Sequence, residues 1–232
     1  MEIVVDSLLT GAGQATGNVA IIDVFRAFTT AAVALANGAS RIIMVSTVEE
    51  AVALRERGVG HLCMGEVGGH APPAFDFGNS PFAIRAVDFS GRTIIQRTSA
   101  GTQGVVAATG AQRLYAASLV TAGATARALG CGAPERISII AMGKGGLRRT
   151  DEDELCALHL RNLLEGRGGN PQAVRELILA GAEAGRFRDS SPPHIHPEDL
   201  DIALDIGRYD FAIRVVLEEG RPVARMERVP GA

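Results

Sequence analysis

The sequence predicts an α/β protein with a three-layer α/β/α arrangement, in which helices cover both faces of a largely parallel or mixed sheet. Short runs rich in β-branched residues alternate with longer segments of helical character, the order typical of parallel strands joined by helices. Capping residues and glycines mark the ends of several longer segments. The 232 residues are expected to form a single domain over residues 1–232, and a second closely packed lobe from about residue 131 is left open.

Seven short apolar runs are expected to form the strands of this sheet, because they are rich in valine and isoleucine and are bounded by turn residues. In chain order they are residues 3–5, 19–24, 41–45, 92–96, 113–117, 136–141 and 211–217.

Five longer segments are expected to be helices, namely residues 27–36, 47–57, 151–164, 172–184 and 197–206. Asn37-Gly38 ends the first, while the capping-box pattern Thr47-Val48-Glu49-Glu50 begins the second and Gly58 ends it. Residues 166–171 and 190–193 are rich in glycine, proline and polar residues, so we expect loops there.

Composition argues against several classes of function. A net charge of -3 and a pI near 6.0 disfavour nucleic-acid binding, which usually requires a basic face. No apolar run approaches the ~20 residues that span a bilayer, and the N-terminus lacks the pattern of a secretory signal, so no membrane association is expected.

The cysteines indicate a reducing compartment. Cys63, Cys131 and Cys156 are widely spaced and form no C-x-x-C pair, so neither disulfides nor a structural zinc site is expected, and a cytoplasmic location fits best. The sequence leaves open whether the chain forms a homodimer.

Asp23 and Arg26 lie where the second predicted strand is followed by a helix, the position at which open α/β sheets bind ligands. A carboxylate can hold a hard metal ion, and a guanidinium can bind a phosphate or sulfonate through two parallel hydrogen bonds. The structural alternative is that Asp23 caps the helix and pairs with Arg26.

Two glycine-containing loops carry further candidates. In Met64-Gly65-Glu66-Val67-Gly68-Gly69-His70, Glu66 is a candidate metal ligand or general base, and an exposed glutamate in a simple turn is the alternative. In Phe75-Asp76-Phe77-Gly78-Asn79-Ser80-Pro81, Asn79 or Ser80 can cap a helix whose free N–H groups bind an anion.

A third loop, Gln96-Arg97-Thr98-Ser99-Ala100-Gly101-Thr102-Gln103-Gly104, directly follows a predicted strand. Its hydroxyl and amide donors converge where the next helix begins, which predicts a phosphate-binding turn. It is not a Walker loop, since the Gly-Lys-Ser/Thr ending is absent. An ordinary turn between strand and helix is the alternative.

Four consecutive acids, Asp151, Glu152, Asp153 and Glu154, begin a predicted helix after a glycine loop that contains Lys144, the only lysine. The positive end of the helix dipole accounts for some of these acids. Because Mg²⁺ binds a few carboxylate oxygens together with waters and substrate phosphate, this cluster can supply metal ligands alongside Asp23 or Glu66.

Together and in this order, the motifs resemble the 2-phosphosulfolactate phosphatase family, the ComB-like proteins associated with coenzyme M biosynthesis. The matching pieces are Asp23-Val-Phe-Arg26-Ala-Phe-Thr-Thr, Gly65-Glu66-Val-Gly-Gly, Phe75-Asp-Phe-Gly-Asn-Ser-Pro81, Thr98-Ser-Ala-Gly-Thr102, and Glu152-Asp153 followed by Cys156-Ala157.

The resemblance implies a Mg²⁺-dependent phosphatase that converts (2R)-O-phospho-3-sulfolactate into 3-sulfolactate and phosphate. Carried over by position, it implies metal binding or water activation by Asp23, Glu66 and Asp153, with Glu152 as a further metal ligand. The residues expected to bind the small anionic substrate are Arg26, Asn79, Ser80, Thr98, Ser99, Gly101 and Thr102. Ser99 or Asp23 as a covalent nucleophile stays open.

Two positions depart from the family pattern, since Val67 stands where arginine is common and Ala100 where asparagine is common. Losing a cation and an amide beside a doubly anionic substrate would weaken sulfonate recognition and leave the metal chemistry intact. Two alternatives therefore remain: a phosphatase for another small phosphorylated acid, and a non-catalytic anion-binding protein on the same fold.

Overall fold

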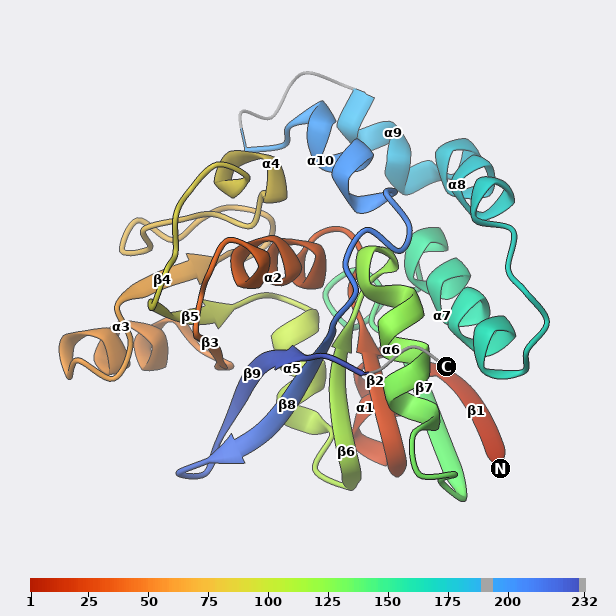
Figure 1. Cartoon of the computed structure of the whole chain (residues 1–232). Helices are drawn as coiled ribbons and strands as arrows, with labels where there is room; N and C mark the ends of the chain where they lie inside the picture. Colours follow the sequence, from red (N-terminus) through yellow and green to blue (C-terminus); the bar gives the residue numbers. More distant parts are fainter. Residues whose placement is uncertain (189–193, 230–232) are drawn as a thin grey trace.

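The computed structural model describes residues 1–188 and 194–229, so the loop predicted over residues 190–193 lies outside it. Within these ranges, nine strands form one mixed sheet with helices on both faces, which confirms the predicted α/β class (Figure 1). The strand that follows residue 131 pairs inside this same sheet. None of the described helices combines the length and hydropathy of a membrane-spanning segment.

The sheet consists of two parallel halves joined by an antiparallel hairpin, in the order β1-β7-β2-β6-β8-β9-β3-β5-β4. One half contains β1 (Glu2–Ser7), β7 (Arg136–Ala141), β2 (Gly17–Ile22) and β6 (Ala111–Ala117). The other contains β3 (Arg41–Met44), β5 (Thr93–Arg97) and β4 (Leu62–Gly65). The hairpin is formed by β8 (Ala212–Glu218) and β9 (Arg221–Glu227).

All seven predicted strands are present, whereas β4 and β9 were not predicted. The β4 strand has only four residues, too few for a periodic pattern to stand out. The β9 strand contains Pro222 and three charged side chains, a composition that disfavours a strand unless neighbours supply its hydrogen bonds.

The helices pack on both faces of the sheet and above its upper edge in Figure 1. In chain order they are α1 (Leu8–Gln14), α2 (Ala27–Ala36), α3 (Val48–Glu56), α4 (Pro81–Ile84), α5 (Gly101–Ala107), α6 (Ala122–Gly130), α7 (Asp151–Leu164), α8 (Pro171–Ala180), α9 (Ala182–Arg188) and α10 (Pro197–Ala203).

Local sequence signals explain several helix ends. Thr47 caps α3 by accepting a hydrogen bond from the Glu50 amide at 3.1 Å, and Ser80 caps α4 by accepting from the Ala83 amide at 3.1 Å. The single helix predicted over residues 172–184 is wrong, because the chain breaks at Gly181 into α8 and α9. Asp151 accepts a hydrogen bond from the Ala182 amide at 3.2 Å and so stabilises the new start.

The strand β2 and the helix α2 lie in the interior, and the short segment between them contributes to the lining of a cavity. Every residue of β2 is buried, as expected for a central strand covered on both faces. Nine of the ten residues of α2 are buried as well, because the helix lies between the sheet and α4. Each large apolar side chain that is fully buried there contributes about 1.5–3 kcal/mol to folding.

The loops that follow parallel strands in both halves of the sheet meet at one place. These loops follow β2 and β7 in one half and β4 and β5 in the other. The helices α8, α9 and α10 lie above this junction, next to α4 and α7 (Figure 1). Four segments that are distant in sequence therefore share one cavity.

Candidate active site

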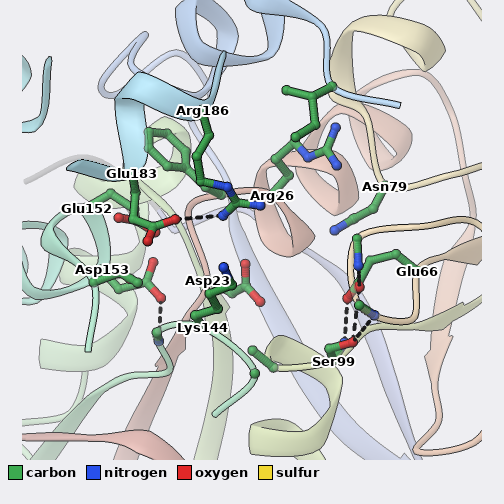
Figure 2. A pocket seen from close by; sticks show the side chains of 18 of the residues that line it. Asp23, Arg26, Glu66, Asn79, Ser99, Lys144, Glu152, Asp153, Glu183 and Arg186 are labelled. Atoms are coloured by element: carbon green, nitrogen blue, oxygen red, sulfur yellow. Dashed lines mark hydrogen bonds and ion pairs between the residues drawn. The ribbon is translucent and has the colours of Figure 1, made fainter. Parts of the chain in front are cut away.

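The cavity at this junction has a volume of about 280 Å³ and is lined by both charged and apolar side chains. Figure 2 shows carboxylates on two sides and cationic side chains between and above them. The lining includes Asp23, Arg26, Glu66, Asn79, Ser99, Ala100, Gly143, Lys144, Glu152, Asp153, Glu183 and Arg186.

Asp23 follows β2 and joins the starts of two helices. Its Oδ1 accepts a hydrogen bond from the Ala27 amide of α2 at 3.0 Å, and its Oδ2 accepts from the Gly101 amide of α5 at 2.8 Å. Burial raises the pKa of Asp23 to about 6, and the negative charge of Glu66 also raises this pKa. The carboxylate is thus held by backbone amides in a place that disfavours its charge.

Gly101 has a steric reason to be glycine. A Cβ at this position would lie 2.9 Å from Asp23 Oδ2 and 2.9 Å from the Ala27 Cβ, closer than such atoms approach in proteins. The absence of a side chain allows α5 to begin directly against the Asp23 carboxylate. This residue therefore shapes the site through its backbone.

Asp153 is held in a similar way from the first turn of α7. Its Oδ1 accepts from the Val24 amide at 2.7 Å, and its Oδ2 accepts from the Gly143 amide at 2.8 Å. With its side chain 2% exposed, burial raises the pKa of Asp153 well above its ordinary value, and the charges of Glu152 and Asp23 add to this effect.

Glu66 accepts three hydrogen bonds on the opposite side of the cavity. Its Oε2 accepts from the Gly69 amide at 2.6 Å and from Ser99 Oγ at 3.0 Å, and its Oε1 accepts from the Ser99 amide at 2.5 Å. These bonds tie the loop after β4 to the loop after β5, so Glu66 is buried and not the exposed turn residue of the alternative hypothesis.

Three buried side-chain oxygens at the cavity have no hydrogen-bond partner within the described part of the chain. They are Oε2 of Glu152, whose side chain is 4% exposed, Oδ1 of Asn79 and Oγ1 of Thr150. Burial raises the pKa of Glu152 to about 7, and the charges of Glu183 and Asp23 also raise it. A buried oxygen without a donor is costly, so these atoms mark places where a ligand or cation can bind.

Three cationic side chains reach the cavity from different segments. Arg26 donates through Nη1 to Asp199 Oδ2 at 2.7 Å and to the His194 carbonyl at 2.8 Å. Arg186 of α9 donates to Glu183 Oε2 at 2.6 Å. Lys144 is exposed in the loop after β7, and the described residues offer it no ion-pair partner.

No three His, Cys, Asp or Glu side chains of residues 1–188 and 194–229 come close enough to form a preassembled metal site. The acids nevertheless influence one another, since Asp23 raises the pKa values of both Glu152 and Asp153. This concentration of buried negative charge fits a cation that completes its coordination with water and substrate oxygens.

Comparison with known proteins identifies the family. The model of the family described as 2-phosphosulpholactate phosphatase matches residues 5–184. The chain belongs to this family. A relative from Bacillus subtilis (strain 168), named probable 2-phosphosulfolactate phosphatase, is 30% identical over 216 residues, which cover 90% of each chain.

Further relatives carry the same name and match shorter stretches. The protein from Thermotoga petrophila is 40% identical over 137 residues, covering 59% of this chain and 58% of the relative. The protein from Carboxydothermus hydrogenoformans is 44% identical over 108 residues, covering 47% of this chain and 44% of the relative. The resemblance stated from the motifs is thereby confirmed.

For this family member, the structure divides the predicted site residues into two groups. One group lines the cavity, as expected of site residues: Asp23, Arg26, Glu66, Asn79, Ser99, Glu152 and Asp153. The other group does not line it and supports the loops: Ser80, Thr98, Gly101 and Thr102.

The residues of the second group were expected to donate hydrogen bonds to the substrate. In the structure they form hydrogen bonds within the protein instead. Ser80 Oγ donates to Asp199 Oδ1 at 2.6 Å. Thr98 and Thr102 bond to each other, with the Thr98 amide donating to Thr102 Oγ1 at 2.8 Å and the Thr102 amide donating to Thr98 Oγ1 at 3.0 Å. The Gly101 amide donates to Asp23.

The alternative hypothesis that Asp23 only caps the following helix and pairs with Arg26 is correct in part. Asp23 does bond to the first turn of α2, but the ion pair of Arg26 is with Asp199, far along the chain. Of the two positions expected to depart from the family pattern, Ala100 lines the cavity, whereas Val67 is exposed outside its lining.

Four charged residues that line or support the cavity were not predicted as site residues: Lys144, Glu183, Arg186 and Asp199. Lys144 stood out as the only lysine in a glycine loop, which was a usable signal. The others lie on α9 and α10, where charged residues in helices carry no local mark of function. Only the packing of these helices above the sheet brings them to the site.

Proposed function

We propose that the chain is a Mg²⁺-dependent phosphatase that hydrolyses (2R)-O-phospho-3-sulfolactate to 3-sulfolactate and phosphate. Membership of the family supports a phosphoric monoester hydrolase, and the names of the relatives suggest this substrate. The observation that carries the proposal is the cavity itself, where buried acids with raised pKa values face cationic side chains. Such a site suits a cation bound together with a phosphate.

Glu152 and Asp153 are the residues we assign to hold the cation. Glu152 has a buried oxygen with no donor among the described residues, and Asp153 is fixed by two backbone amides. Glu66 is a weaker candidate because three hydrogen bonds already engage its oxygens. When bound, Mg²⁺ supplies neutralisation of the charge on the phosphate oxygens.

Arg26, Lys144 and Arg186 are assigned to bind the anionic groups of the substrate. Phosphoryl transfer depends mainly on positioning and on electrostatic stabilisation of the equatorial oxygens, so donors fixed around the phosphate suffice for much of the catalysis. Asn79 and Ser99 complete the lining on the side opposite Glu152 (Figure 2).

Direct attack by water is favoured over a serine nucleophile. Ser99 Oγ accepts from the Gly68 amide at 3.0 Å and from Arg97 Nη1 at 3.4 Å while it donates to Glu66 at 3.0 Å, so neither lone pair is free for attack. Asp23 has the central position, electrostatically coupled to Glu66 and to Glu152, and we assign it to accept the proton of the attacking water.

A second candidate substrate follows from Ala100. This residue lines the cavity at a position where the resemblance to the family leads us to expect asparagine, so the amide expected to recognise a sulfonate is missing. Another small phosphorylated acid is the alternative substrate. In either case the proposed setting is the cytoplasm, and a role in coenzyme M synthesis depends on the sulfonate substrate.

The test is phosphate release from purified protein with Mg²⁺, using phosphosulfolactate and a panel of small phosphorylated acids that lack the sulfonate. We expect turnover that disappears with a chelator and returns with Mg²⁺. Preference for phosphosulfolactate supports the named reaction, whereas preference for another ester supports the alternative. Binding without turnover of any ester contradicts the enzyme proposal.

A further inference from the structure

Asp199 is fully buried at the start of α10 and joins three segments that are far apart in sequence. Its Oδ1 accepts from Ser80 Oγ at 2.6 Å and from the Phe82 amide at 3.0 Å, which ties α10 to α4. Its Oδ2 accepts from Arg26 Nη1 at 2.7 Å and from the His196 amide at 3.4 Å. One carboxylate thus fixes a side chain of the cavity to the helices above it.

The hydrogen bonds of Arg26 within the protein involve only Nη1, which leaves Nε and Nη2 available to bind an anion. Nη1 carries two hydrogens, and their acceptors are Asp199 Oδ2 and the His194 carbonyl. The described residues provide no acceptor for Nε or Nη2, although Arg26 lines the cavity. The remaining edge of the guanidinium is the one that binds two oxygens of an anion in parallel.

We propose that Asp199 is a positioning residue that orients Arg26 so that its Nε and Nη2 edge binds the phosphate or sulfonate oxygens of the substrate. This inference rests on the proposed function for the identity of the anion. Asp199 lies beyond residues 5–184, the part of the chain that the family model matches. The helices above the sheet therefore contribute to recognition by aiming a side chain that belongs to the β2 loop.

A purely structural role makes a different prediction. The Arg26 and Asp199 pair is buried, so removing one partner leaves an uncompensated charge and lowers stability whether or not Arg26 binds an anion. If Asp199 instead orients Arg26 toward the anion, replacing Asp199 should weaken anion binding only when residue 26 is an arginine. A double-mutant cycle separates these two roles.

The experiment measures inorganic phosphate binding by calorimetry and substrate kinetics for wild type, Asp199→Asn, Arg26→Lys and the double variant. We expect Asp199→Asn to weaken phosphate binding and raise KM by about tenfold, with kcat changed by less than about threefold, because a bidentate charged contact is lost. In the Arg26→Lys background, Asp199→Asn should cause little further weakening. Equal weakening in both backgrounds overturns the proposal.

Asp201→Asn is the matched control. Asp201 lies on the same helix and pairs with Arg175 of α8 at 3.1 Å, outside the cavity lining. Its variant should retain wild-type phosphate affinity and KM. Equal weakening by Asp201→Asn and Asp199→Asn would mean that general loosening of α10 is responsible, which contradicts the proposal.

A milder variant covers the case in which Asp199→Asn does not fold. Ser80→Ala removes one donor to the same carboxylate and keeps its charge, so phosphate affinity should fall by about threefold. Unchanged affinity in whichever variant folds overturns the inference. Phosphate binding that depends on Asp199, without turnover of any ester, leaves the inference intact and refutes only the proposed reaction.

Discussion

Glu66 and Glu152 are buried glutamates on opposite sides of the same cavity, yet their carboxylates have different surroundings (Figure 2). Glu66 accepts three hydrogen bonds from the adjoining loops, so its charge is compensated within the protein. Glu152 keeps one buried oxygen without a donor among the described residues, and its pKa is raised to about 7. The difference indicates that Glu66 organises the site and that Glu152 is available to a ligand.

Asp153 and Glu154 extend the comparison, because they are neighbours in one helical turn with different surroundings. Asp153 points to the cavity and bonds to two amides, whereas Glu154 accepts from Ser7 Oγ at 2.6 Å on another side of α7. A run of consecutive acids in the sequence therefore does not reveal which of them face the cavity. Variants of these acids test this division.

The largest effect is expected for Asp153→Asn. The amide nitrogen would have to face the Val24 or Gly143 N–H, and the negative charge beside the proposed cation would be lost. We expect kcat/KM to fall by about a hundredfold or more, the scale seen when a group that stabilises the transition state is removed. Steady-state phosphate release measures this, with Glu154→Gln as the control that should remain active.

Glu152→Gln should separate activity from stability. Replacing a buried acid that lacks a donor with a neutral amide removes a desolvation cost, so the thermal midpoint of the cation-free protein at pH 8 should rise. The Mg²⁺ concentration needed for half-maximal activity should increase by about tenfold as one ligand weakens. A lower midpoint together with an unchanged Mg²⁺ requirement would assign Glu152 a structural role.

Glu66→Gln should have the opposite effect on stability. The amide group presents N–H donors toward the amides of Gly69 or Ser99, so at least one charge-assisted hydrogen bond is lost. We expect the free energy of unfolding to fall by about 1.5–3 kcal/mol, measured by denaturant titration. If stability is unchanged, the comparison with Glu152 fails.

The smallest effect concerns pH. Asp23 and Glu152 have folded-state pKa values raised to about 6 and about 7, so the stability they contribute is complete below about pH 4 and is lost as pH rises through those values. Burial lowers the pKa of His159, which acts in the opposite direction. Because several groups titrate together, the effect of Glu152 is measured by comparing the pH dependence of the thermal midpoint in wild type and in Glu152→Gln.

Between pH 5 and pH 8, the thermal midpoint of cation-free wild type should fall more steeply than that of Glu152→Gln. Added Mg²⁺ should raise the wild-type midpoint more at pH 8 than at pH 5, since the carboxylates are then ionised. Parallel pH profiles for the two proteins would show that Glu152 does not titrate in this range.

The sequence determined the fold class, most element positions and half of the site. Alternating apolar runs and capped helices define the strands and α2, α3 and α7, because local hydrogen bonding and periodic burial act over a few residues. The motifs also identified Asp23, Glu66 and two of the four acids of α7, Glu152 and Asp153, since each follows a strand or opens a helix.

Only the tertiary structure decided which donors face the cavity. Thr98, Thr102 and Ser80 resemble anion ligands in sequence, but each is used inside the protein, and Arg26 finds Asp199 at a separation of 173 residues. Glu183 and Arg186 join the site because α9 packs above the loops of both sheet halves, and Lys144 reaches it from the loop after β7. Contacts between distant segments depend on the packing of whole elements, which local residue patterns do not specify.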